Sequence, residues 1–200
     1  MKLASWVVGA FLLSGACFGQ SAEFFFQAGA SRLSNAELGG FVSSTTGEAE
    51  TLSLKNGWRI GTRMALNTWR YFGHEFGYAY NRTHLRYEVA GTEQGMAIHQ
   101  GFYNFMVYGT REGSKFRPFI GGGFHFNNYV PPGSSVTSGG GNTKFGVNYG
   151  GGLKIRLGQI FAIRFDLHQY TNPKPFADSL QGRTGWLRQT EISAGFGLVI

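Results

Sequence analysis

Charged side chains of both signs stand within several stretches of alternating apolar and polar residues. Four are basic and three are acidic: Arg59, Arg63, Lys154, Arg164, Glu75, Asp166 and Glu191. Such a group could form a path for protons or ions, supply a catalytic carboxylate, or make a fixed network of salt bridges. We expect the fixed network, because charges withdrawn from water must be paired and hydrogen-bonded, and both signs are present.

Other reactive residue types give no further site. Cys17 is the only cysteine and lies in an N-terminal leader, so thiolate nucleophiles, zinc–thiolate sites and iron–sulfur clusters are excluded from the rest of the chain. The histidines show no carboxylate or histidine neighbours at ligand spacing: His74, His84, His99, His125 and His168. The glycine runs 121–123, 139–141 and 150–152 do not lead into a helix, as a phosphate-binding loop requires. We expect no catalytic residue, no cofactor and no metal.

The first residues are typical of a secretory signal. Lys2 supplies a positive start, Trp6–Leu13 is apolar apart from one glycine, and small residues follow. We expect a signal peptide over residues 1–19 and one domain over residues 20–200. The apolar stretch is shorter than the roughly 20 residues that span a bilayer as a helix, so an uncleaved anchor is disfavoured, as is a lipoprotein acylated at Cys17. Without a further cysteine, no disulfide can stabilise the exported domain.

The composition excludes several classes of protein. Glycine accounts for 32 of the 200 residues and aromatic side chains for 16%, whereas Asp, Glu, Lys and Arg reach only 14%, against about a quarter in a typical soluble domain. A charged, helix-rich enzyme does not have this composition, and a disordered chain lacks so much apolar surface. No apolar run reaches the roughly 18 residues of a transmembrane helix.

The elements that position the charged residues are β-strands. Alternation of apolar and polar residues, without a helical period after the leader, predicts eight of them. Their ranges are Glu23–Leu33, Thr51–Leu66, Tyr71–Tyr87, Met96–Thr110, Arg117–Tyr129, Lys144–Leu157, Ile160–Tyr170 and Trp186–Ile200. Longer connections (34–50, around 89–95, 130–143 and 171–185) alternate with short turns at 67–70, 111–116 and 158–159. This order places the long loops at one rim of a barrel and the short turns at the other, as in bacterial outer-membrane barrels.

The two faces of the predicted strands differ in polarity. In the strand Ile160–Tyr170, Phe161 and Phe165 lie on one face, and Arg164 and Asp166 on the other. Large aromatic residues alternating with charges favour an apolar face toward lipid and a polar interior, in which glycines let longer side chains pack. A soluble, lipocalin-like barrel would reverse the faces and is the alternative. We predict an all-β fold, an eight-stranded antiparallel up-and-down transmembrane β-barrel.

Aromatic residues are expected to form girdles at the two membrane interfaces. They are Trp58, Trp69, Tyr78, Tyr80, Tyr87 and Trp186. Asn56 and His74 fall on the lipid-facing side of the pattern, where polar groups cost most at the bilayer midplane. A local bulge or an interfacial position would explain both, and we favour the interface for His74, which follows a periplasmic turn by three residues.

Three motifs carry a resemblance to a known family. One is the segment 117–123, which opens a strand after a short turn, and another is Tyr149–Leu153, which leads by a tight turn into residues 161–166. The third is a C-terminal pattern made of Ser193, Gly195, Leu198 and Ile200. The chain resembles the eight-stranded outer-membrane β-barrels of the outer-membrane protein A and opacity type, without their peptidoglycan-binding domain. The resemblance implies recognition of the C-terminal pattern by the barrel assembly machinery, although the family favours a terminal phenylalanine over isoleucine.

The resemblance also brings an enzymatic alternative, because some barrels of this size modify lipid A. The deacylases among them place a histidine and a serine two residues apart on a late strand. Here the hydroxyl is Thr171, three residues after His168, and this spacing puts the two side chains on opposite faces of a strand. We expect no enzyme activity and keep a lipid A-modifying enzyme and a small pore as alternatives.

The expected role is structural or one of surface interaction in the outer membrane of a Gram-negative-type bacterium. The long external loops Ser34–Glu50, Val130–Thr143 and Thr171–Gly185 would contact an extracellular surface ligand. The net charge of +7 fits an anionic partner, and an exported barrel meets lipopolysaccharide rather than nucleic acid. Its phosphates are expected near Arg82, Arg86, Arg183 and Arg188. We expect a monomer.

Overall fold

The computed structural model describes residues 21–43, 47–135, 141–177, 180 and 184–200. The expected signal peptide and its cleavage site lie outside the described residues. The described residues form ten strands: β1 (Ala22–Ser34), β2 (Glu37–Val42), β3 (Ala49–Leu54), β4 (Gly57–Trp69), β5 (Phe72–Tyr87), β6 (Thr92–Tyr108), β7 (Phe116–Val130), β8 (Asn142–Arg156), β9 (Phe161–Pro173) and β10 (Trp186–Val199). Over the same residues, no helix is long and apolar enough to cross a membrane.

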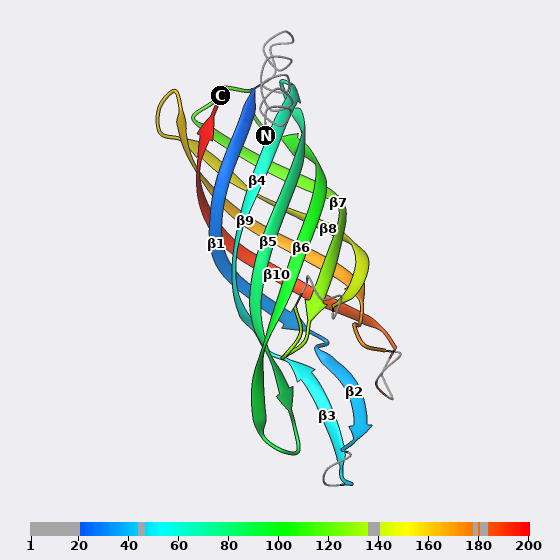
Figure 1. Ribbon diagram of the computed structural model, residues 1–200. Helices are drawn as coiled ribbons and strands as arrows, with labels where there is room; N and C mark the ends of the chain where they lie inside the picture. The colour runs from blue at the N-terminus through cyan, green and yellow to red at the C-terminus, as the bar shows by residue number, and fades with distance from the viewer. Residues whose placement is uncertain (1–20, 44–46, 136–140, 178–179, 181–183) are drawn as a thin grey trace, which may run out of the picture.

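Eight of these strands close into an antiparallel barrel (Figure 1). The strands from β4 to β10 pair in chain order, and β1 pairs with both β4 and β10. Each barrel strand is therefore paired on both sides, as a sheet that crosses a membrane requires, because lipid offers no hydrogen-bond partners. The predicted eight-stranded up-and-down barrel is confirmed. Most strand boundaries shift by only a few residues, although β6 begins at Thr92 rather than Met96.

A hairpin replaces much of the first long loop. The sequence predicts a polar loop over 34–50 and one strand over 51–66, but the chain forms β2 and β3 and breaks before β4. Here β3 leaves the barrel wall and pairs with the far end of β5. Asn56 lies in the break, where its side-chain oxygen accepts a hydrogen bond from the backbone of Leu33 at 2.8 Å. Asn56 thus occupies a strand junction rather than the lipid-facing side of a strand.

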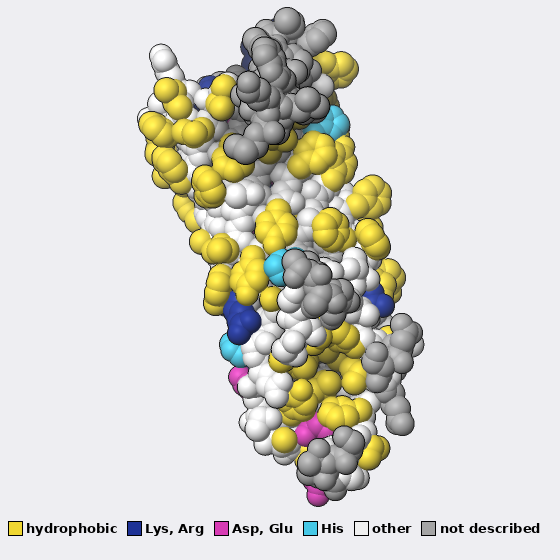
Figure 2. All heavy atoms as spheres, viewed as in Figure 1, with side chains coloured by type: hydrophobic (Ala, Val, Ile, Leu, Met, Phe, Trp, Pro, Cys, Tyr) yellow, Lys and Arg dark blue, Asp and Glu magenta, His cyan; other side chains and the backbone are white. Residues whose placement is uncertain are grey.

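The barrel is apolar outside and polar inside. Hydrophobic side chains are spread over its outer wall (Figure 2). In β9, Phe161 and Leu167 are 47% and 57% exposed, whereas Arg164 and Asp166 are 0% and 4% exposed. This alternation continues in β10. The soluble, lipocalin-like alternative would require the opposite order of faces, so the structure contradicts it.

One end of the barrel extends into a folded projection (Figure 1). We call it the crown: β2, β3, the turn 88–91 and the adjoining ends of β5 and β6. An apolar cluster lies under the crown, and full burial of such side chains contributes about 1.5–3 kcal/mol each. It consists of Leu38, Leu52, Leu54, Leu85, Met96, Ile98, Tyr129 and Leu187. The short turns lie at the other end, where Ala22 donates a backbone hydrogen bond to Ile200 at 3.0 Å.

Candidate functional site

The middle of the lumen holds a network of buried ion pairs. The Nη1 atom of Arg63 lies 2.6 Å from Glu75 Oε1, and its Nη2 atom lies 2.8 Å from Glu191 Oε2. Arg164 pairs with Glu75 and, through Nη2 at 2.7 Å, with Asp166 Oδ1. All five side chains are buried. Every carboxylate of this network faces a guanidinium, which is the condition under which buried charge is tolerated.

Arg59 and Lys154 extend the charged lumen toward its two ends. Arg59 Nη1 lies 2.8 Å from Glu191 Oε2, and its guanidinium lies 5.3 Å from the ring centre of Tyr170. Lys154 pairs with Glu23 near the short turns. The structure therefore places all seven charged residues named from the sequence inside the barrel, six of them in one connected group and Lys154 in a second.

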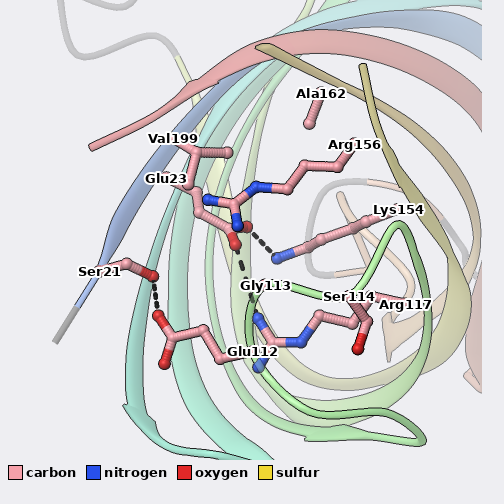
Figure 3. A pocket seen from close by; sticks show the side chains of 10 residues that line it. All are labelled: Ser21, Glu23, Glu112, Gly113, Ser114, Arg117, Lys154, Arg156, Ala162 and Val199. Carbon is pink, nitrogen blue, oxygen red and sulfur yellow. Dashed lines mark hydrogen bonds and ion pairs between the residues drawn. The ribbon is translucent and has the colours of Figure 1, made fainter. Parts of the chain in front are cut away.

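The second group lies at the mouth that carries the short turns (Figure 3). Glu23 pairs with Lys154 and lies 3.6 Å from Arg117 Nη1. Arg117 also donates to Asn67 at 2.9 Å, and its guanidinium lies 3.5 Å from the ring centre of Tyr108. Glu23 and Arg117 were predicted from the sequence as strand starts but not as charges of the lumen. Both stand on the inward side of their strands, so the alternation that identified the other charges also contained these two.

Uncharged polar groups continue the lumen from the ion-pair network toward the crown. Gln189 donates to Asn81 at 2.9 Å and to Ser31 at 2.8 Å. Asn127 donates to Asn172 at 3.0 Å and accepts from Gln100 at 2.9 Å. These amides lead to the apolar cluster under the crown.

At the opposite mouth, the hollow beside Glu23, Arg117 and Lys154 measures only about 20 Å³, close to the volume of one water site. The side chains drawn in Figure 3 converge on this hollow and leave little room at the mouth. The described lumen is therefore packed at both ends, by ion pairs at this mouth and by the apolar cluster under the crown.

The described residues do not bring His168 and the hydroxyl of Thr171 together as a catalytic pair. His168 is buried in the lumen, whereas Thr171 stands on the outward side of β9, opposite the exposed Val147. His168 does have a carboxylate neighbour, since its Nε2 lies 3.3 Å from Asp166 Oδ1, and the sequence analysis missed this pair. Arg164 pairs with the same carboxylate, that of Asp166. Within the described part of the chain, no three His, Cys, Asp or Glu side chains gather as a metal ion would need.

Comparison with known proteins identifies the family. The outer membrane protein beta-barrel domain matches residues 9–199. The chain belongs to this family. Membership indicates an outer-membrane location, with the outer wall in contact with lipid and lipopolysaccharide. A comparison with curated proteins gave no match.

Solved outer-membrane barrels share the fold at low sequence identity. OprG from Pseudomonas aeruginosa is 10% identical, with a TM-score of 0.58 over 90% of this chain and 96% of that one. Neisserial surface protein A is 13% identical, with a TM-score of 0.56 over 88% of this chain and 96% of that one. The N-terminal barrel domain of Pseudomonas aeruginosa OprF is 14% identical, with a TM-score of 0.52 over 90% of this chain and 97% of that one.

The outer wall of this outer-membrane barrel carries the expected aromatic residues. Trp58, Trp69 and Trp186 are 50%, 72% and 55% exposed, with Trp69 next to a short turn and the other two toward the crown. Tyr87 was predicted for a girdle but lies in the crown, because β5 extends past the wall, and its ring packs 6.4 Å from that of Phe41. The remaining girdle candidates, Tyr78 and Tyr80, lie on the outward side of β5, and the ring of Tyr80 lies 5.9 Å from that of Trp58.

The arginines expected to meet lipopolysaccharide do not all share one position. Arg82 and Arg188 lie on the outward sides of β5 and β10, just past the aromatic residues. Arg32, which was not predicted from the sequence, lies opposite Thr190 in the β1–β10 pairing, two residues along β10 from Arg188. Arg86 lies in the crown, where its Nε is 3.1 Å from Glu88. Arg183 lies outside the described residues.

The C-terminal pattern lies in the strand that closes the barrel. Ser193 and Gly195 stand on the inward side of β10, opposite Gly29 and Gln27 of β1. Leu198 and Ile200 are exposed on the outer wall. A role of these residues in assembly stays a prediction.

Proposed function

We propose that this outer-membrane barrel acts without catalysis, as a surface-interaction protein that binds through its crown. The observation that carries the proposal is the way the crown is held together. The Glu50 carboxylate of β3 accepts backbone hydrogen bonds from Val89 at 2.7 Å and Ala90 at 2.9 Å, in the turn between β5 and β6. The hydrogen bond from Val89 holds the pKa of Glu50 below its usual value. A surface that is already ordered loses less conformational entropy when it binds.

The crown also exposes apolar side chains where no lipid covers them. Val42 and Val89 are 60% and 63% exposed. Phe41 and Tyr87 pack against each other below them. We propose that a partner covers these two valines, because burial of apolar side chains favours association. The packed lumen supports the same proposal, because it leaves no wide path for solutes at the two described mouths.

Adherence of cells that display the protein tests the proposal. Cells displaying V42S/V89S should adhere to cultured epithelial cells several-fold less than cells displaying the wild type. The A49S variant changes an exposed residue of the same hairpin while leaving both valines, and it should adhere like the wild type. Gel mobility before and after boiling checks that all three proteins are folded. Equal adherence of V42S/V89S and wild type would remove the proposal.

We propose further that lipopolysaccharide phosphates contact Arg82 and Arg188, together with Arg32. The three guanidiniums face outward at the level where lipid headgroups meet the wall, and charge-assisted hydrogen bonds to phosphate are the strong ones. Loss of all three charges in R32Q/R82Q/R188Q should lower the lipopolysaccharide that co-purifies with the barrel at least fivefold. R86Q, in the crown, should leave it unchanged. Equal amounts in all three proteins would count against the contacts.

Export and assembly complete the proposal. Residues 1–19 would be removed as a signal peptide, leaving the domain 20–200. The barrel assembly machinery would recognise Ser193, Gly195, Leu198 and Ile200. The position of this pattern on the closing strand supports the idea, because β10 must be recognised before it pairs with β1.

A further inference from the structure

The short turns carry a cluster of cations on one side of the barrel rim. Arg70 lies in the turn between β4 and β5, and Arg111 and Lys115 lie in the turn between β6 and β7; all three are exposed. Arg156, half-buried, ends β8. The next turn, residues 157–160, contains no charged residue. The positive charge is therefore concentrated below β4 to β8 rather than spread around the rim.

Backbone contacts hold these turns together. Glu112 donates its N–H to the carbonyl of Arg70 at 3.2 Å, and Arg156 donates its N–H to the carbonyl of Lys115 at 2.8 Å. The Arg111 Nε donates to the hydroxyl of Tyr71 at 3.3 Å. Glu112 is the acidic residue of these turns, and its carboxylate accepts a hydrogen bond from Ser21 (Figure 3). The group thus keeps a net positive charge at this rim.

Two hollows on the outer wall lead away from this cluster. One, of about 290 Å³, is bounded by Thr68, Trp69, Phe72, His74 and Phe105. The other, of about 470 Å³, shares the first three of these residues and continues to Arg70, Tyr71 and Glu112, whose carboxylate accepts a hydrogen bond from Ser21. The two hollows together form a continuous path from the apolar wall to the guanidinium of Arg70. Two polar side chains line the hollow in the wall, Thr68 and His74, and His74 is already hydrogen-bonded to the Tyr103 hydroxyl at 2.8 Å.

We propose that this path binds a phospholipid with an anionic headgroup from the inner leaflet of the outer membrane. An acyl chain would lie along the outward side of the packed rings of Trp69, Phe72 and Phe105. The headgroup phosphate would contact Arg70 and Arg111. The arrangement of an apolar hollow ending at exposed cations matches the two parts of such a lipid. Cations at a membrane surface attract anionic lipid, with an effect of about fivefold in binding for each Lys or Arg. The inference does not depend on the crown's proposed role.

Tryptophan quenching in vesicles tests this site specifically. The variant W58F/W186F retains Trp69 as the tryptophan of residues 20–200. In vesicles of phosphatidylcholine and phosphatidylglycerol with matched acyl chains, brominated phosphatidylglycerol should quench Trp69 several-fold more effectively than brominated phosphatidylcholine. Adding R70Q/R111Q should abolish this preference. Adding K55Q/R86Q, which removes the same charge from the crown, should preserve it.

A second reporter distinguishes this site from a general attraction. The variant W69F/W186F retains Trp58 near the opposite interface, and R70Q/R111Q should not change its quenching. Equal quenching of Trp69 by the two brominated lipids would overturn the proposal, as would a preference that survives R70Q/R111Q. The proposal is also overturned if R70Q/R111Q leaves the lipid preference of Trp69 intact but reduces co-sedimentation with purified peptidoglycan. The cations would then face that polymer.

Discussion

Glu75 is the residue on which the lumen network depends most. It accepts a hydrogen bond from Arg63 at 2.6 Å and pairs with Arg164, and all three side chains are fully or almost fully buried. Glu75→Gln keeps the shape but leaves two neighbouring guanidiniums short of one negative charge. Breaking a buried ion pair in this way costs about 3–5 kcal/mol. The free energy of unfolding in urea, measured on the barrel in lipid vesicles, should fall by that amount.

A matched change on the surface provides the control. Glu93→Gln removes a carboxylate whose Oε1 lies 3.3 Å from Lys55, with both side chains 41% exposed. An exposed pair of this kind contributes about 0–1 kcal/mol. If Glu75→Gln and Glu93→Gln shift the unfolding free energy equally, the lumen network does not stabilise the barrel.

Among the elements, the β2–β3 hairpin is joined to the β5–β6 turn partly through the Glu50 carboxylate, and this contact makes the crown sensitive to acid. Hydrogen bonds lower the pKa of Glu50 from its usual 4.5. The stabilisation is therefore complete above about pH 4.5 and is lost as the pH falls through the lowered value. Amide hydrogen exchange at Val89 and Ala90, corrected for intrinsic rates, should accelerate as Glu50 becomes protonated. Glu50→Gln should show weaker protection at neutral pH and no such transition.

The elements also show how far the sequence could predict the structure. Alternation predicted β9 and its inward Arg164 and Asp166, because the membrane and the lumen impose opposite polarity on successive residues. It did not predict β2, and it joined β3 and β4 into one strand over 51–66. The crown lies beyond the barrel wall, so lipid and lumen do not impose a regular change of polarity on its strands. Pairing of β3 with β5 depends on an apolar cluster assembled from distant segments. Glu23 and Arg117 followed the pattern but stood near strand starts, where the faces are hardest to assign.

For the whole molecule, closure of the barrel depends on the contact between β1 and β10. A Cβ atom at Gly29 would lie 2.2 Å from the backbone oxygen of Ile192 and 2.6 Å from Ser193 Cβ, so Gly29→Val should force the two strands apart. Its neighbour Ala28 is exposed to lipid, and Ala28→Val should be tolerated there. Wild type and A28V should migrate differently on gels before and after boiling, because a closed barrel stays folded in detergent. G29V should migrate as the unfolded form in both lanes. A shift like that of the wild type for G29V would mean that the pairing of β1 with β10 tolerates a larger side chain at this position than its register implies.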